Sequence, residues 1–75
     1  MRPPSQVAKD FGKAVRMLRI KRGITQQQLA DACGIDLSYV GQVERGQRNP
    51  TLGVMHGIAK VLQTKLSVLL NEAHL

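Results

Sequence analysis

The chain has 75 residues, enough for one small domain and too few for two. Its apolar fraction of 43% is ordinary for a folded globular chain and argues against disorder. Eleven Lys and Arg stand against five Asp and Glu, so the formal net charge is +6. Such a charge indicates an anionic partner, and nucleic acid is the leading candidate. The competing interpretation is that the basic composition only keeps a small protein in solution.

Residue usage excludes several classes of function. One cysteine, Cys33, cannot form an internal disulfide, and with the distant His56 and His74 it gives no zinc-ligand spacing, so we expect no metal and no other cofactor. The chain has no nucleophile–base pair, carboxylate pair or phosphate-binding glycine loop, so we expect neither an enzyme nor a small-molecule substrate. No apolar run approaches the roughly 18 residues of a membrane span, and the first six residues lead into charged ones. We therefore expect a cytoplasmic protein with no membrane partner.

The apolar spacing is helical throughout, and no segment shows sustained alternation with period two. We expect residues 1–6 to form a flexible arm and residues 7–75 to form a single domain. The first helix is predicted from Val7 to Lys21, and Gly23 ends it. Its inward face is expected to comprise Val7, Phe11, Ala14, Val15 and Leu18. The basic residues off that face are either an ordinary solvated surface or a source of long-range attraction to DNA; they are Lys9, Lys13 and Arg16.

Two short helices joined by a tight turn are predicted next. Thr25 and Gln28 form a capping-box pair that starts the second helix, and Gly34 ends it. Asp36 is a favourable N-cap for the third helix, which Gly46 ends. The inward-facing residues are Leu29, Ala30 and Cys33 on the second helix and Val40 and Val43 on the third. Because only three residues separate the two helices, they cross steeply, which is the arrangement of a helix-turn-helix unit.

The C-terminal part is predicted to form two further helices. A polar loop at residues 47–50 leads to Thr51, which caps the fourth helix. Ser67 is expected to cap the fifth helix, from Val68 to about Ala73. The inward residues are expected to be Leu52, Met55, Ile58, Ala59 and Leu62 on the fourth helix, Leu69 and Leu70 on the fifth, and Leu66 between them. The predicted fold class is therefore all-α, with five helices.

The ordered set of residues from Arg19 to Leu70 resembles the helix-turn-helix domain of lambdoid phage repressors and Xre-type regulators. The positions that carry the resemblance are Arg19, Gly23-Ile24-Thr25-Gln26, Leu29-Ala30, Gly34-Ile35, Val40, Val43-Glu44-Arg45-Gly46, Asn49-Pro50-Thr51-Leu52, Ile58-Ala59 and Leu62. The short length and the run at residues 36–40 also resemble the controller proteins of restriction–modification systems, which are small five-helix homodimers. Two positions depart from the family pattern. Gln63 stands where glycine is common, and Leu37 stands where many relatives have a polar or basic side chain that reads bases.

The resemblance implies a lambda-repressor-like fold whose third helix enters the major groove of double-stranded DNA. The expected base contacts are Leu37, Ser38 and Gln42, of which Gln42 can make a bidentate contact to adenine. The expected phosphate contacts are Gln26, Tyr39, Arg45, Gln47, Arg48 and Asn49. An ion pair between Arg19 and Glu44 is expected to tie the first helix to the third. The competing interpretation of the exposed residues is a plain solvated face, in which Asn49 only shapes the turn before Pro50.

Two functions fit these features. The first is a transcription regulator that binds a (pseudo)palindromic operator as a homodimer, because one small domain makes too few base contacts to find a site in a genome. The dimer surface is then expected on the last two helices, with Val61, Leu66, Val68 and Leu69. The second is an antitoxin-like interaction module, in which the C-terminal apolar surface holds a different protein and DNA binding is secondary. The sequence leaves open whether such a regulator activates or represses transcription.

Overall fold

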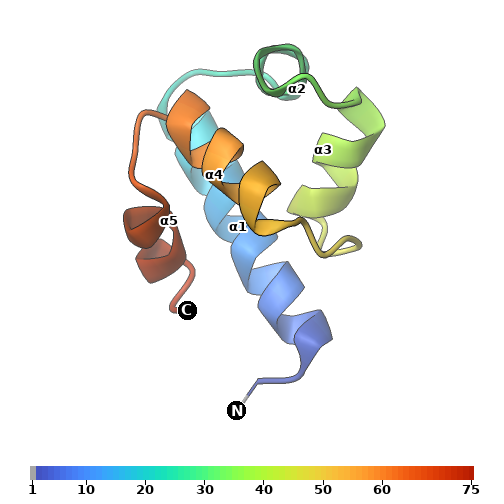
Figure 1. The fold of residues 1–75 in the computed structure, drawn as a ribbon, viewed down its shortest axis with the longest axis vertical. Helices are drawn as coiled ribbons and strands as arrows, with labels where there is room; N and C mark the ends of the chain where they lie inside the picture. The colour runs from blue at the N-terminus through green and yellow to red at the C-terminus, as the bar shows by residue number, and fades with distance from the viewer. Residues whose placement is uncertain (1) are drawn as a thin grey trace.

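The computed structural model describes residues 2–75 and folds them into five α-helices (Figure 1). In chain order they are α1 (Pro4–Lys21), α2 (Gln26–Cys33), α3 (Leu37–Glu44), α4 (Leu52–Val61) and α5 (Leu66–Glu72). No strand occurs among residues 2–75, so the predicted all-α, five-helix fold class is confirmed. The long helix α1 contacts both α3 and α5, and α2 contacts α3 and α4. None of the helices in the described part of the chain is long and apolar enough to cross a membrane.

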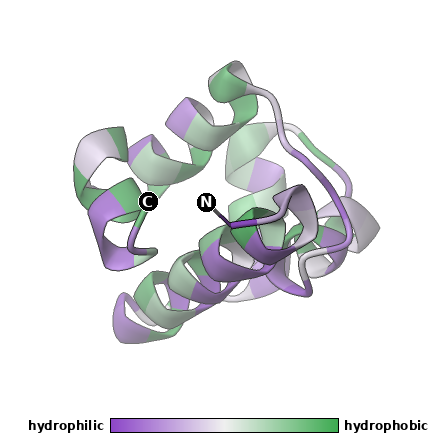
Figure 2. Cartoon of the chain, turned by 90° about the horizontal axis from the view of Figure 1, so that it is seen from below, coloured by the Kyte–Doolittle hydropathy of each residue, from purple (hydrophilic) through white to green (hydrophobic). Residues whose placement is uncertain are grey.

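The core lies where the five helices converge. Its members are Phe11, Ala14, Val15, Leu29, Ala30, Val40, Val43, Ile58, Ala59, Leu62, Leu69 and Ala73. A second layer of half-buried side chains packs against this cluster and includes Leu18, Cys33, Met55, Leu66 and Leu70. Figure 2 shows that hydrophobic and hydrophilic residues share the helices, as amphipathic helices require. The helical periodicity therefore predicts most of the core correctly.

One residue assigned to the inward face of α4 lies at the surface. Leu52 is 67% exposed, whereas Ile58 and Ala59 further along the helix are buried. Leu52 is the first residue of α4. Periodicity extends an apolar face to the end of a helix whether or not a neighbouring helix reaches that far, and the prediction for Leu52 is wrong for this reason.

The first helix begins at Pro4, three residues earlier than the predicted start at Val7. Pro3 is its N-cap and Pro4 occupies the first helical position. Proline suits that position because its fixed φ is already helical and its missing N–H has no partner there in any case. Residues 4–6 therefore belong to α1, and the prediction of a flexible arm is wrong for them.

Arg2, ahead of this helix, bonds to the other end of the chain. Its Nη1 donates to the carbonyl oxygen of His74 at 2.8 Å and lies 3.2 Å from Oδ2 of Asp10. The guanidinium group thus caps the exposed carbonyls at the end of α5, where a positive charge is favourable. Arg2 is therefore not part of a free arm either, while Met1 lies outside the described residues.

The helix-turn-helix unit has the capping that the sequence predicts. Oγ1 of Thr25 accepts from the backbone N–H of Gln28 at 3.0 Å, and Oε1 of Gln28 accepts from the backbone N–H of Thr25 at 2.9 Å. Gly34 ends α2 with a φ of 68°, and Asp36 is the N-cap of α3, although its side chain makes no capping hydrogen bond. Cys33 is half-buried beside this turn, and burial raises the pKa of its thiol. The raised pKa is consistent with a packing role, because the thiolate is the reactive form.

Gln63, which stands where glycine is common in the resembled family, lies directly after the C-cap of α4. The backbone N–H of Gln63 donates to the carbonyl of Lys60 at 3.1 Å, and that of Thr64 donates to Ala59 at 3.0 Å. These two bonds form a Schellman motif, which needs a left-handed residue after the helix. Gln63 supplies it with a φ of 58°. The turn that glycine commonly makes in the family is therefore made here by a glutamine.

The fifth helix starts earlier than predicted. It begins at Leu66 after Lys65, so the expected start at Val68 with Ser67 as the cap is wrong. No side chain caps this helix. The starts of α2 and α4 are marked in the sequence by a threonine whose side chain caps the helix, and α5 has no such residue. The nearby Ser67 was predicted as the cap because serine is a common N-cap residue.

Candidate nucleic-acid interface

Helix α3 has one buried side and one free side. Val40 and Val43 are each 1% exposed and hold the helix against the core. On the opposite side Ser38 and Arg45 are exposed and Leu37 is 43% exposed. The free side therefore carries an exposed hydroxyl group and an exposed guanidinium group, while the amide of Gln42 on the same helix is half-buried.

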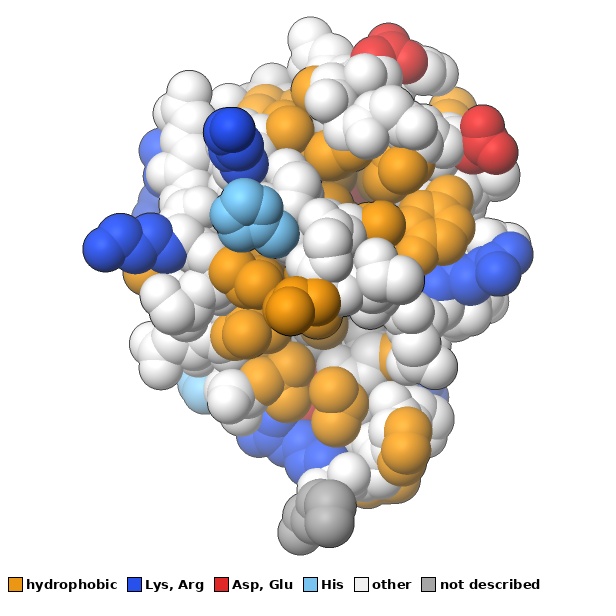
Figure 3. All heavy atoms as spheres, in the orientation of Figure 1, with side chains coloured by type: hydrophobic (Ala, Val, Ile, Leu, Met, Phe, Trp, Pro, Cys, Tyr) orange, Lys and Arg blue, Asp and Glu red, His pale blue; other side chains and the backbone are white. Residues whose placement is uncertain are grey.

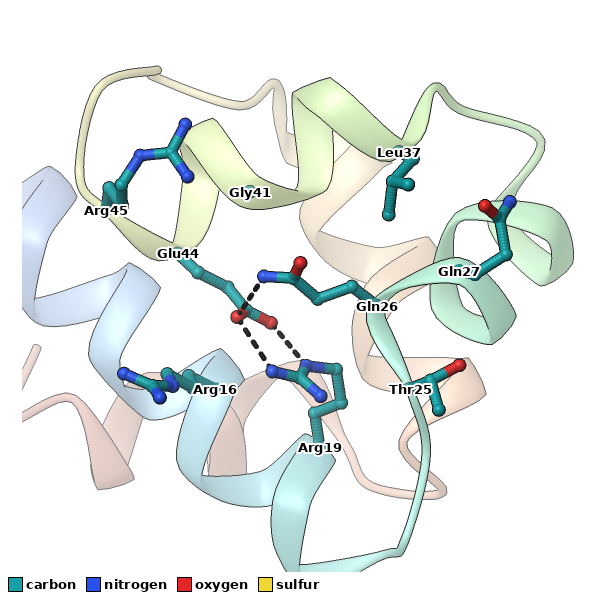
Figure 4. Close-up of a pocket in the computed structure, with 9 residues that line it drawn as sticks. All are labelled: Arg16, Arg19, Thr25, Gln26, Gln27, Leu37, Gly41, Glu44 and Arg45. Carbon is teal, nitrogen blue, oxygen red and sulfur yellow. Dashed lines mark hydrogen bonds and ion pairs between the residues drawn. The ribbon is translucent and has the colours of Figure 1, made fainter.

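A hollow of about 700 Å³ lies beside this free side, between α3, the start of α2 and the second half of α1 (Figure 4). Leu37 and Gln27 lie at one end of the hollow, and Arg16 and Arg45 lie at the other. Neither of these two arginines forms an ion pair within residues 2–75. The surface beside the free side of α3 is therefore open and carries uncompensated positive charge.

The floor of the hollow is a hydrogen-bonded cluster around Glu44, whose side chain is only 3% exposed. Nε and Nη2 of Arg19 donate to the two carboxylate oxygens of Glu44 at 2.6 and 3.1 Å, and Nε2 of Gln26 donates at 3.0 Å. Nη1 of Arg19 also donates to the carbonyl of Ile24 at 2.9 Å. The ion pair expected between Arg19 and Glu44 is present, and together with the hydrogen bond from Gln26 it joins α1, α2 and α3 at one point (Figure 4).

The side chain of Gln26 has a different environment from the one expected for a phosphate contact. Its amide nitrogen is turned toward Glu44 inside the cluster. The backbone N–H groups of Gln26 and Gln27, in the first turn of α2, have no hydrogen-bond partner among residues 2–75. The unpaired donors at this helix start are therefore backbone groups rather than the Gln26 side chain.

A second polar cluster lies at the other edge of α3. Nε of Arg48 donates to Oε1 of Gln42 at 3.0 Å, and the Arg48 guanidinium carbon lies 5.8 Å from the centroid of the Tyr39 ring. Nε of Arg45 donates to Oε1 of Gln47 at 3.3 Å. The structure therefore brings together most of the side chains expected to touch DNA, and several are already bonded to one another.

The remaining expected contact, Asn49, is exposed in the loop after α3. Gly41, in the middle of the free side, is covered by the guanidinium of Arg45, which would lie 3.1 Å from a Cβ at this position. Substitution at Gly41 would thus displace Arg45 before it met any backbone. The small residue leaves room for the arginine to lie along the helix.

One member of the expected dimer surface is buried in the core of the single chain. Leu69 is completely buried, so the prediction that it contacts a second subunit is wrong. Val68 is 45% exposed, and Val61 and Leu66 are half-buried. The burial of Leu69 agrees with its other expected place, on the inward face of the fifth helix.

Sequence reasoning missed the role of Gly12 in placing α3. A Cβ at Gly12 would overlap the carbonyl oxygen of Val43 and lie 2.8 Å from that of Glu44, both in the backbone of α3. Only glycine allows α1 and α3 to approach so closely. The available signal was a glycine inside a helix, which costs about 1 kcal/mol relative to alanine and so usually has a packing reason.

Two short helices joined by a tight turn, the second with a free polar face beside arginines that form no ion pair within residues 2–75, define a DNA-binding helix-turn-helix protein. A family model described as "Helix-turn-helix" matches residues 15–69. The chain therefore belongs to the helix-turn-helix family and is a DNA-binding transcriptional regulator with the lambda-repressor-like fold.

Individual proteins support this assignment. The chain is 38% identical to the uncharacterized HTH-type transcriptional regulator YazB of Bacillus subtilis over 73% of its own length and 80% of YazB. It is 40% identical to the control protein C.SmaI of Serratia marcescens over 77% of its length and 69% of C.SmaI. The crystal structure of the restriction-modification controller protein C.AhdI from Aeromonas hydrophila matches with a TM-score of 0.80 and 42% identity, over 83% of this chain and 94% of C.AhdI. Other curated relatives are longer, and the chain spans between 41% and 59% of their length.

Proposed function

We propose that the protein regulates transcription as a homodimer that binds a (pseudo)palindromic operator, with α3 of each subunit in the major groove. The observation that carries this proposal is the free polar side of α3, which is braced from behind by Val40 and Val43. A helix held in this way can present its side chains to base edges without first becoming ordered. Such a regulator works where the chromosome is, so we expect it in the cytoplasm.

In this proposal Ser38 and Gln42 read base edges, and Leu37 contacts a thymine methyl group. Arg45, Arg48, Gln47, Asn49 and Tyr39 contact phosphates around them, which sets the register and supplies most of the salt-sensitive affinity. Gln26 contacts a phosphate through its backbone N–H at the start of α2, because its side-chain nitrogen is engaged with Glu44. Arg16, across the hollow from α3, adds attraction for the DNA backbone.

The second subunit supplies the base contacts that one small domain lacks. The apolar surface proposed for the contact is formed by Val61, Leu66 and Val68. Figure 3 shows that hydrophobic side chains are exposed over much of the face on which α4 and α5 lie in Figure 1. In Figure 1 α5 and α3 lie on opposite sides of the molecule, and α3 packs mainly against α1 and α2, so pairing through α4 and α5 leaves both reading helices open.

Selection of binding sites from a random DNA pool, followed by gel-shift titration at several salt concentrations, tests the proposal. We expect two inverted half-sites whose centres are about 10 base pairs apart, one helical turn. Affinity is expected to fall steeply with salt, because phosphate contacts release counterions. Equal affinity for every duplex would reject sequence-specific regulation. A chain that stays monomeric at working concentration and on DNA would reject the dimer and favour the antitoxin-like alternative.

A further inference from the structure

We infer that Arg48, a loop residue outside α3, determines which base Gln42 reads by fixing the orientation of the Gln42 amide. The inference rests on the proposed function, in which Gln42 faces a base edge. It assigns Arg48 a positioning role in addition to its phosphate contact.

The chemistry of the two groups fixes the orientation of the amide. A guanidinium group carries only donors, so the atom of Gln42 that faces it must be the carbonyl oxygen. Nε of Arg48 lies 3.0 Å from Oε1 of Gln42, which is an ordinary hydrogen-bond distance. A half-turn of the amide would place its NH₂ group against the donors of Arg48 and lose this bond. Nε2 of Gln42 makes no hydrogen bond within residues 2–75, so its hydrogens remain available to DNA.

Arg48 is itself held in place from the core. Its guanidinium carbon lies 5.8 Å from the centroid of the Tyr39 ring, within the range of a cation–π contact. Tyr39 is half-buried and packs against the hydrophobic core. Arg48 forms no ion pair within the described residues, and with Nε bonded to Gln42 its two terminal nitrogens remain free for a phosphate. A phosphate there would hold Arg48, and through it Gln42, more firmly.

The fixed orientation changes the expected base. A freely rotating glutamine amide suits adenine, because it accepts from the N6 amino group while it donates to N7. In this chain Oε1 of Gln42 accepts the hydrogen bond from Arg48, so the NH₂ group of Gln42 is the part that faces the base. Guanine presents two adjacent acceptors, N7 and O6, to such a donor. We therefore expect guanine rather than adenine opposite Gln42, in contrast to the expectation from residue type alone.

Site selection and competition binding on four variants test the inference. The wild type is expected to select guanine at one position in each half-site, and Gln42→Ala is expected to lose that preference. Arg48→Ala is expected to lower the guanine-to-adenine ratio at that position alone by about five- to tenfold, within the range of one bidentate base contact. The double variant should match Gln42→Ala in base preference. Lys60→Ala, a change at an exposed basic residue of α4 to which the proposed function gives no contact with DNA, is the control and should leave the ratio unchanged.

The outcomes separate the inference from the proposed function. Arg48→Ala that weakens all sequences equally, with the ratio unchanged, would reduce Arg48 to a phosphate contact and overturn the inference. Selection of adenine by the wild type, or an unchanged preference in Gln42→Ala, would overturn it while leaving the proposed regulator intact. Absence of any sequence preference in the wild type would overturn both. Arg48 is exposed in a loop and Gln42 is half-buried outside the core, so all variants are expected to melt within a few degrees of the wild type.

Discussion

At the scale of single residues, Glu44 is a carboxylate whose side chain is almost entirely shielded from solvent. Its carboxylate accepts three hydrogen bonds from two side chains and is 3% exposed. The partner guanidinium of Arg19 is 12% exposed. A buried pair of this kind contributes little net stability over an apolar pair, but removal of one partner leaves an uncompensated buried charge.

Glu44→Ala is therefore expected to destabilise the fold before it affects DNA binding. The free energy of unfolding should fall by about 3–5 kcal/mol, because Arg19 is left without its carboxylate. Urea denaturation followed by circular dichroism measures this change. Asp31→Ala, at an exposed carboxylate, is the control and should change stability by no more than about 0.5 kcal/mol. A Glu44→Ala protein with wild-type stability and reduced DNA affinity would contradict the structural role.

Two glycines inside helices should respond in opposite directions to alanine. Gly12→Ala is expected to lower the free energy of unfolding by about 1–3 kcal/mol, despite the better helix propensity of alanine, because the new methyl group meets the backbone of α3. Gly57→Ala in α4 meets nothing within 4 Å and is expected to stabilise by up to about 1 kcal/mol. Thermal melts of both variants compare them directly. If both variants shifted the melting temperature in the same direction, the close approach of α1 and α3 would be refuted.

The left-handed residue after α4 offers another pair of opposite changes. Gln63→Gly is expected to raise stability by about 1 kcal/mol, because glycine adopts a φ of 58° without steric cost. Gly23→Ala, at a φ of 69° with open space around it, should lower stability by a similar amount from backbone strain alone. Chemical denaturation gives both values. No gain in Gln63→Gly would mean that the glutamine side chain compensates for its backbone.

At the scale of elements, the predictability of each helix depends on where its signals lie. The start of α2 was predictable because Thr25 and Gln28 are a local capping pair, and the ends of α1, α2 and α3 were predictable because glycine marks each one. The start of α1 was not, because proline at a helix start resembles a helix breaker in a sequence. The start of α5 was not, because only tertiary packing fixes its register.

The candidate interface also has parts that the sequence predicts and parts that it does not. Helical periodicity predicted which side of α3 is free, and the family resemblance predicted the Arg19–Glu44 pair. The bonds of Gln26 to Glu44 and of Arg48 to Gln42 were not predictable, because they join separate elements and depend on how those elements cross. The role of Gly12 is of the same kind, since nothing local identifies which helix lies against it.

At the scale of the whole molecule, the proposed dimer is open to a direct test. Val68→Lys is expected to prevent pairing and lower DNA affinity without unfolding the chain, because Val68 is 45% exposed. Light scattering measures the mass, and gel shifts on the selected operator measure affinity. Ile20→Lys, at an apolar residue of α1 that is 58% exposed, is the control and should leave the mass unchanged. A dimer that survives Val68→Lys but dissociates in Ile20→Lys would move the interface to α1.

The contact of Gly12 with the backbone of α3, together with the Glu44 cluster, couples α3 to α1 and α2 as one body. In the proposed function, α3 would therefore meet DNA already in its final conformation, and binding would involve no ordering step. The association rate should then be governed by diffusion and by the basic surface, and it should rise as ionic strength falls. Discrimination between operator and random sequence should accordingly appear as a difference in residence time, because only the dissociation rate depends on how well the base edges match.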